Sequence, residues 1–202
     1  LDCWNTTCLE EAMGLPEERD IVRVLRSFIL VAYKDQAEYP SHVVNACLDN
    51  KRQFTPLMFA CSRGQRTVVT FLLEHRAVVD LQDAKGRSAL HFAAHRGHLD
   101  IVNMLLDRCD DIRTRINQAD FQGENALVAA VKGGHLDVAQ RLVAMGAHYK
   151  LDADNTLLHI ACGAGYAHLI QFLFDIGFGP SAAAFTDGSA LHRAVVNEEV
   201  SC

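Results

Sequence analysis

The chain has 202 residues and a formal net charge of −6, which excludes a uniformly basic protein that binds polyanions over its whole surface. Half of the residues are hydrophobic, enough to bury an apolar core, so the composition excludes a disordered chain. The most apolar run, residues 27–33, is far too short to span a bilayer. The seven cysteines include no CxxC pair, and this scatter favours reduced thiols in a cytoplasmic or nuclear protein over disulfides.

The first 49 residues show the weakest patterns. Residues 1–19 have no clear periodicity and are interpreted as a poorly defined N-terminal segment that either packs on the array or is frayed. From Ile21 to Ala32 apolar residues recur at helical spacing after a short acidic stretch, so we expect a helix that continues to about Lys34. Residues 41–45 fit a short helix or a strand. We interpret residues 20–49 as capping helices or a degenerate repeat, because the end of a repeat array has only one neighbour.

A short sequence motif then recurs through the rest of the chain. Each copy opens on a polar residue and continues with a leucine and a pair of small residues, as in Ser88-Ala-Leu-His-Phe-Ala-Ala. The copies lie about 33 residues apart, and such self-similarity is typical of helical repeat arrays. They begin at Thr55, Ser88, Asn125, Thr156 and Ser189.

The residue types inside each copy predict two helices joined by a tight turn. Hydroxyl residues at the opening position are good N-caps, and Pro56 follows where a missing amide costs nothing. The leucine of each copy should be buried on one helix face, and the small residues beside it, Cys61 and Cys162 among them, let neighbouring helices approach. A glycine ends each first helix and a second apolar helix follows. The leucines are Leu57, Leu90, Leu127, Leu158 and Leu191, and the glycines are Gly64, Gly97, Gly134 and Gly165.

These motifs resemble the ankyrin repeat, whose core sequence is Thr-Pro-Leu-His-x-Ala-Ala followed by Gly-His. Two Asp-x-x-Gly motifs, at Asp83 and Asp120, match the turn that opens the ankyrin hairpin. The resemblance implies an all-α ankyrin-repeat solenoid, in which helix-turn-helix pairs carry projecting β-hairpin loops. We place the repeats in residues 50–202, at about 50–82, 83–118, 119–150, 151–183 and 184–202, the last of them incomplete.

Departures from the repeat length predict local differences. The second repeat has four extra residues within Cys109–Gln118, which predict a longer finger or an extra helical turn at Cys109–Ile116. The junction between the third and fourth repeats is two residues short, which predicts a shortened hairpin near Ala153–Asn155. The chain begins without Met and stops inside a repeat that lacks its second helix. We therefore expect both ends to lie within a longer protein, and the apolar face of the last repeat to be exposed unless more chain follows.

The histidines are the first candidates for chemistry. His91 and His95 are spaced i, i+4 and could hold a metal. The HExxH motif of metalloproteases, however, requires glutamate at the position of Phe92. The resemblance instead implies that histidines tie the repeats together through backbone groups of the hairpin loops, and it leaves His95 without such a role. We find no catalytic constellation, phosphate loop or metal site, so we expect no enzymatic activity, metal or cofactor. The histidines with implied structural roles are His91, His98, His135, His159 and His192.

Binding to another protein is the functional prediction. In ankyrin-like arrays the hairpin tips and the inner ends of the first helices form a concave surface that binds proteins. The first two repeats carry six cations and no acid in these slots, so we expect an acidic peptide or protein to dock there, with Phe54 and Phe121 as apolar anchors. The resemblance places the following residues on this surface: Lys51, Arg52, Phe54, Arg63, Lys85, Arg87, His95, Arg96, Phe121, Gln122, Glu124 and Lys132.

Several alternatives stay open. The same charges would suit a solvated face whose cations pair with neighbours. Nucleic acid is disfavoured as a partner because aromatic residues interleaved with the basic ones are scarce. The rival function is a regulatory or substrate-recruiting segment of a larger enzyme, channel or secreted effector whose catalytic part lies outside these residues. We expect a monomer that does not engage membranes, and Asn117 occupies a position that is hydroxylated in some ankyrin-like proteins.

Overall fold

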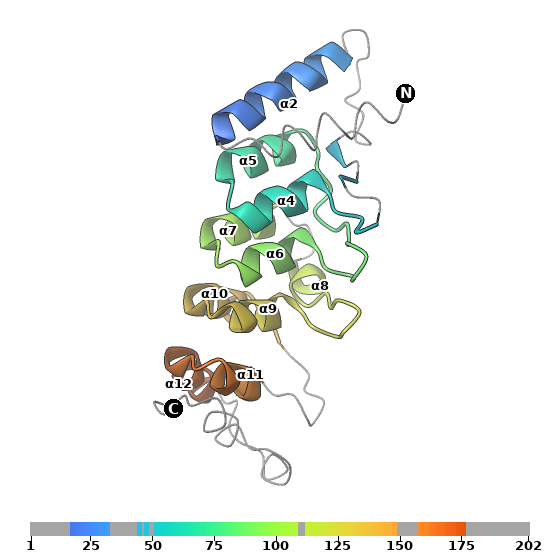
Figure 1. Ribbon diagram of the computed structural model, residues 1–202. Coiled ribbons are helices and arrows are strands. Elements are labelled where there is room, and N and C mark those ends of the chain that lie inside the picture. Colours follow the sequence, from blue (N-terminus) through green and yellow to red (C-terminus); the bar gives the residue numbers. More distant parts are fainter. Residues whose placement is uncertain are drawn as a thin grey trace.

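The chain folds into a single file of paired helices, seen in a computed structural model that describes residues 17–32, 44–45, 47–48, 51–108, 112–148 and 157–176 (Figure 1). The file opens with α2 (Glu18–Ala32), which falls where the sequence predicts the first helix. Four helix pairs follow within the residues just given. They are α4 (Pro56–Arg63) with α5 (Arg66–Glu74), α6 (Ala89–His95) with α7 (Leu99–Asp107), α9 (Ala126–Gly133) with α10 (Leu136–Ala144), and α11 (Leu157–Gly163) with α12 (Ala167–Asp175).

The helices form two layers. The first helices of the pairs, α4, α6, α9 and α11, pack on one another in order, and the second helices, α5, α7, α10 and α12, pack in a parallel row (Figure 1). Helix α2 lies against α5 at the N-terminal end of the stack. The loops that precede α6 and α9 project to one side of the stack, on the right of Figure 1. This arrangement confirms the predicted all-α solenoid, and no helix in the described part of the chain is long and apolar enough to cross a membrane.

The predicted signals start and end the helices. Thr55 caps α4 by accepting a hydrogen bond from the Met58 amide at 3.3 Å. Asn125 caps α9 by accepting from the amides of Leu127 and Val128. Ser88 caps α6 differently, because its own amide donates to the His91 ring at 3.1 Å. Thr156 and Ser189 lie outside the described residues.

The core is a continuous apolar spine between the two layers. The predicted leucines Leu57, Leu90, Leu127 and Leu158 are all buried, while Leu191 falls outside the described residues. Cys61 and Cys162 are also buried, as predicted. Burial raises the pKa of the Cys61 thiol far above its ordinary value, so this side chain is a small, protonated core residue.

An aromatic ring of each repeat packs on the turn glycine of the repeat before it. Gly64, Gly97 and Gly134 adopt positive φ angles of 73°, 75° and 79°, which glycine tolerates best. A Cβ atom at these positions would lie 2.5 Å, 2.3 Å and 2.7 Å from rings in the following repeat. The rings belong to His98, His135 and Tyr166 respectively. The turn glycines therefore serve both the helix end and the contact between repeats.

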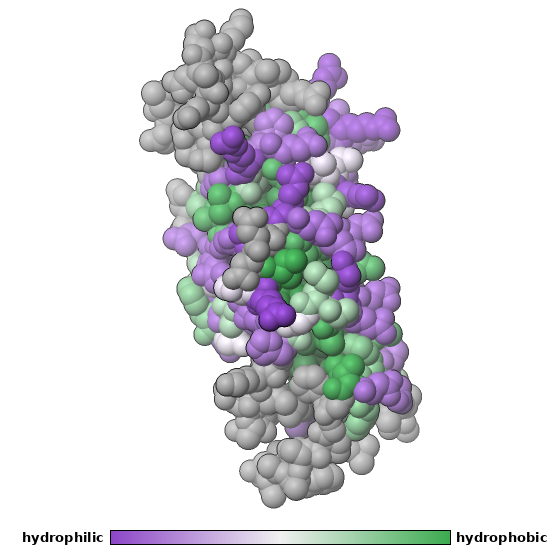
Figure 2. Space-filling model, turned by 180° about the vertical axis from the view of Figure 1, so that it is seen from behind, coloured by the Kyte–Doolittle hydropathy of each residue, from purple (hydrophilic) through white to green (hydrophobic). Residues whose placement is uncertain are grey.

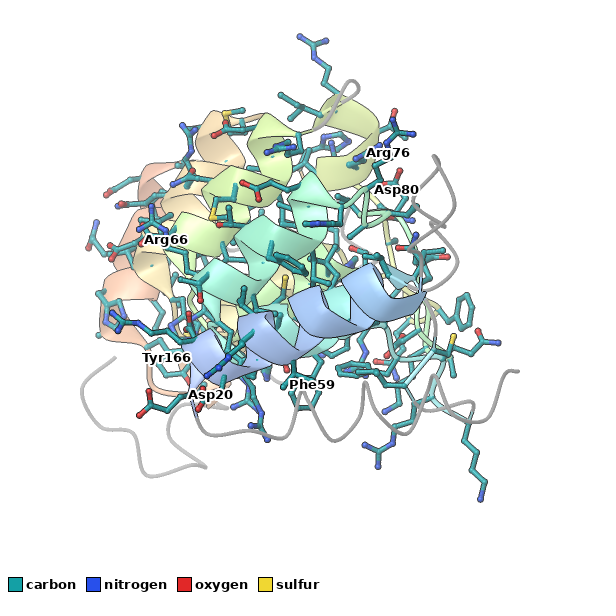
Figure 3. The ribbon with its side chains drawn as sticks, turned by 90° about the horizontal axis from the view of Figure 1, so that it is seen from above. Asp20, Phe59, Arg66, Arg76, Asp80 and Tyr166 are labelled. Carbon is teal, nitrogen blue, oxygen red and sulfur yellow. The ribbon has the colours of Figure 1, made fainter. Side chains whose placement is uncertain are left out.

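This turn edge and the loop edge lie on opposite sides of the stack (Figure 3). Seen from above, Arg66 and Tyr166 lie at the edge where the second helices begin, whereas Arg76 and Asp80 lie at the edge where the loops leave them. Phe59 lies between the two edges in this view. The face seen from behind mixes green apolar patches with purple polar side chains (Figure 2).

The four extra residues of the second repeat accompany an additional short helix, α8 (Ile112–Ile116). Its Ile116 is fully buried, and Arg115 pairs with Asp80 at 2.8 Å. Of the two predicted alternatives, the extra helical turn is therefore the correct one. The predicted clipped hairpin near Ala153–Asn155 lies outside the described residues. Also outside the described residues are 1–16, most of 41–45 and the chain after 176. The predicted boundaries of the repeats therefore stay predictions.

Candidate protein-binding groove

Two of the hairpins are folded by the aspartates that open them. Asp83 accepts hydrogen bonds at Oδ1 from the amides of Lys85 and Arg87, at 2.9 Å and 2.8 Å. Asp120 accepts in the same way from the amides of Gln122 and Glu124. The Asp-x-x-Gly motifs therefore form tight turns, as the sequence predicts, because the aspartate oxygen accepts hydrogen bonds from amides that lack a backbone partner in such a turn.

Neighbouring hairpins are joined at their tips by backbone hydrogen bonds. The Ala84 amide donates to the Arg52 carbonyl at 2.8 Å, and the Phe121 amide donates to the Lys85 carbonyl at 3.0 Å. Three consecutive loops are thereby linked in a row. The side chains that these tips carry are held at fixed spacing along the array.

A groove of about 970 Å³ runs between the hairpins and the first helices α4, α6 and α9. It brings together all the predicted binding residues except Arg63 and Phe121. Phe121 is 76% exposed on its hairpin, where its ring packs over Gly86. The lining residues are Lys51, Arg52, Phe54, Ser62, Asp83, Ala84, Lys85, Arg87, His91, Phe92, His95, Arg96, Asp120, Gln122, Glu124, Ala129 and Lys132.

Three phenylalanines form an aromatic cluster at the basic end. The Phe54 ring stands edge-on to Phe92 at a centroid distance of 5.0 Å and to Phe59 at 6.4 Å. The guanidinium of Arg87 lies 4.5 Å from the Phe92 centroid, and that of Arg63 lies 4.6 Å from Phe59. Such cation–π contacts hold arginine side chains in place. Sequence reasoning identified Phe54 but missed Phe59 and Phe92, although both occupy the same slot four residues after the cap.

Six basic and three acidic residues line the groove, an excess of three positive charges in a chain of net charge −6. Two of the cations are neutralised inside the groove. Arg87 donates twice to Oδ2 of Asp83, at 2.7 Å and 3.0 Å, and Lys132 donates to Glu124 at 2.6 Å. Arg87 is therefore paired with the turn-forming Asp83, which lies outside the predicted binding positions, as the alternative of cations that pair with neighbours expects.

The Asp83 carboxyl is 4% exposed and carries a shifted pKa. Burial alone would raise this pKa. The hydrogen bonds from the Arg87 side chain and from the Arg87 and Lys85 amides, together with the Arg87 charge, outweigh burial, and the pKa lies below its ordinary value. Asp83 is therefore ionised at neutral pH and belongs to the fold of the hairpin.

The histidines of the groove tie repeats together. His91 is buried, and its Nδ1 accepts the Ser88 amide, so Nε2 carries the proton that it donates to the Glu124 carbonyl at 3.0 Å. Burial lowers the pKa of His91, which keeps the ring neutral. The structural role predicted for His91 is confirmed. His135 has the same kind of role, because its Nε2 lies 3.1 Å from the His95 carbonyl.

His95 differs from its prediction. The sequence gives it no structural role, but its Nδ1 lies 3.3 Å from the Ala129 carbonyl of the next repeat. No group of three or more His, Cys, Asp or Glu side chains that could hold a metal is present among the described residues. His159 is buried as well, whereas His192 lies outside the described residues.

Asn117 has a structural role between α8 and the turn that follows α10. Its side-chain amide donates to the carbonyls of Arg113 and Gly146 and accepts from the His148 amide. These bonds hold the end of α8 against the turn that follows α10. Whether Asn117 is hydroxylated stays a prediction.

Comparison with known families agrees with this geometry. The model for ankyrin repeats, described as three copies, matches residues 19–120, 77–153, 112–183 and 127–202. The chain belongs to the ankyrin repeat family. Its ankyrin array is similar to the ankyrin repeat domain-containing protein SAT10 of Stachybotrys chartarum, at 34% identity over 84% of this chain and 8% of that protein.

Other relatives of the ankyrin array are proteins of diverse kinds. The probable E3 ubiquitin-protein ligase XBOS32 of Oryza sativa is 31% identical over 71% of this chain and 28% of its own length. The human ankyrin repeat domain-containing protein 63 is 33% identical over 67% of this chain and 37% of its own length. The chain thus spans between 8% and 37% of the length of the curated relatives named here. Ankyrin repeats are protein–protein interaction modules, and this chain carries that module.

Proposed function

We propose that this ankyrin array is a scaffold whose concave groove binds an acidic peptide or an acidic face of another protein. The observation that carries the proposal is the excess of three positive charges in the groove of a chain whose net charge is −6. A local field of that sign attracts acidic partners and speeds their association. Phe54 and Phe92 add apolar surface beside the cations, and such aromatic surface with arginine around it is typical of binding hot spots.

The rival function is a regulatory or substrate-recruiting segment within a larger enzyme or channel. It is favoured by the small share of each relative that the chain covers and by what those relatives are. One is a probable ubiquitin ligase, and another is the human transient receptor potential cation channel subfamily A member 1, 33% identical over 60% of this chain and 11% of the channel. In that case the groove would still bind the acidic partner, and the catalytic or conducting part would lie in other residues. We place the protein in the cytoplasm or nucleus, because its buried thiols suit a reducing compartment.

Selection from a random-peptide display library tests the proposal. The 202-residue chain is immobilised, and bound peptides are sequenced after selection at low and at physiological salt. We expect enrichment of Asp and Glu, stronger at low salt because screening weakens attraction between exposed charges. Enrichment of neutral or basic peptides, or of none, would refute the acidic partner.

A further inference from the structure

The positive charges of the groove are not equivalent. Arg87 and Lys132 already face the carboxylates of Asp83 and Glu124. Each of these pairs presents no net charge to a ligand. An acidic partner that drew Arg87 or Lys132 away from its carboxylate would leave that carboxylate without its cation, and this cost opposes binding.

Lys85 and Arg96 stand apart from these pairs. Both line the groove, Lys85 at the tip of the second hairpin and Arg96 directly after α6. Within the described part of the chain, neither side chain has an ion-pair or hydrogen-bond partner, and the bonds that these residues make come from their backbones. Their charges are therefore available to a ligand.

An aromatic surface accompanies both cations. Phe92 lies one turn before Arg96, whose amide donates to the Phe92 carbonyl at 3.2 Å. The guanidinium of Arg87, two residues after Lys85, covers the Phe92 ring. Phe54 abuts Phe92 edge-on and is itself only partly buried, so it offers an apolar contact in the same groove.

We infer that Lys85 and Arg96 select the partner, and that they do so by binding acidic side chains on either side of an apolar residue that contacts Phe54. Arg87 and Lys132 shape the groove without contributing to its charge selectivity. The inference rests on the proposed function and adds to it the chemistry of the bound segment. That segment is an extended peptide in which acidic residues flank an apolar one.

Direct binding measurements on matched peptides test the inference. The probes are fluorescein-labelled peptides with one leucine flanked on each side by glutamates at varied glycine spacing. Each is paired with a peptide that has glutamine for every glutamate, and a third has alanine for leucine. Fluorescence anisotropy gives both affinities, and their ratio measures selectivity for acid. A variant that merely distorts the groove weakens both peptides and leaves this ratio unchanged.

Lys85→Gln and Arg96→Gln should each lower the ratio about threefold and together about tenfold, the size expected for exposed charge contacts. The matched controls remove one cation together with its own carboxylate: Asp83→Asn with Arg87→Gln, and Glu124→Gln with Lys132→Gln. Because each control leaves the net charge of the groove unchanged, the ratio should stay at the wild-type value. Phe54→Ala should abolish the advantage of leucine over alanine in the peptide.

Several results would overturn the inference. One is a ratio that falls as far in the paired controls as in the Lys85 and Arg96 variants. Another is the failure of every flanked-leucine peptide to bind while display selection still yields acidic peptides, which would leave the proposed function standing. A third is tighter binding of an oligothymidine probe than of any peptide with the same dependence on Lys85 and Arg96, which would assign the surface to single-stranded nucleic acid. Selection without acidic peptides would refute both the function and the inference.

Discussion

The contact between His135 and Gly97 allows the joint between two repeats to be tested at a single atom. Gly97→Ala would place a Cβ 2.3 Å from the Nδ1 atom of His135, at a backbone φ of +75°. Gly123→Ala is the matched control, because its φ is +79° and no atom lies within 4 Å of the added Cβ. Both alanines adopt the left-handed conformation, which costs about 1 kcal/mol. Only Gly97→Ala meets the ring of the next repeat.

The difference between the two variants follows from the structure. The His135 ring must retreat by most of an ångström, which breaks the contact of its Nε2 with the His95 carbonyl at 3.1 Å. Loss of that hydrogen bond costs about 1 kcal/mol, and overpacking of a well-filled contact costs about 1–3 kcal/mol more. We therefore expect Gly97→Ala to lower the free energy of unfolding by about 2–4 kcal/mol more than Gly123→Ala.

Urea unfolding followed by circular dichroism measures both losses, and a double-mutant cycle isolates the contact. In a His135→Ala background the ring is gone, so Gly97→Ala should cost only the backbone strain of about 1 kcal/mol. Equal losses for the two glycine variants, or strict additivity with His135→Ala, would refute the claim that the rings lock successive repeats.

Three further predictions concern the spine and the titrating groups. Leu127→Ala should lower the free energy of unfolding by about 3 kcal/mol, since the side chain is fully buried, whereas Val78→Ala, 43% exposed, should change it by less than about 0.5 kcal/mol in the same urea titration. Asp83→Asn should cost about 1–2 kcal/mol at pH 7 through loss of the Arg87 pair. Because the folded pKa of Asp83 is lowered, this difference should begin to shrink below about pH 4, the ordinary pKa of an aspartate, and vanish only below the folded pKa; a constant difference would contradict it. The lowered pKa of His91 should make the wild type lose stability as the pH falls below about 6.5, since only the unfolded chain binds that proton readily; thermal melts across pH should show a shallower loss for His91→Gln, and equal slopes would contradict the neutral ring.

The elements that the sequence predicted are those governed by local chemistry. Thr55 and Asn125 start helices because their side chains reach amides two or three residues ahead, and Gly64 and Gly134 end them because the backbone requires positive φ. These interactions span one helical turn and recur in every repeat. The repeat spacing then places equivalent positions side by side, which is why most of the predicted binding residues line one groove.

The errors concern partners that differ from one repeat to the next. His95 bonds the Ala129 carbonyl, 34 residues away in the next repeat. The repeated sequence motif does not predict such a contact, because the contact depends on which residues two particular repeats bring together. The Arg87–Asp83 pair is different, since its i, i+4 spacing is visible in the sequence. It was missed because Asp83 had been assigned to the turn alone, whereas its Oδ1 folds the hairpin and its Oδ2 holds the arginine.

The two uses of Asp83 explain how a groove can be both rigid and selective. If every groove cation were unpaired, mutual repulsion would spread the hairpins and any polyanion would bind. Pairing Arg87 with Asp83 and Lys132 with Glu124 removes that repulsion and fixes the walls through charge-assisted hydrogen bonds. The charges of Lys85 and Arg96, two of the four other cations of the groove, then lie on a scaffold whose tips are joined by backbone bonds. A ligand must match their positions, because the array cannot adjust to it without breaking contacts between repeats.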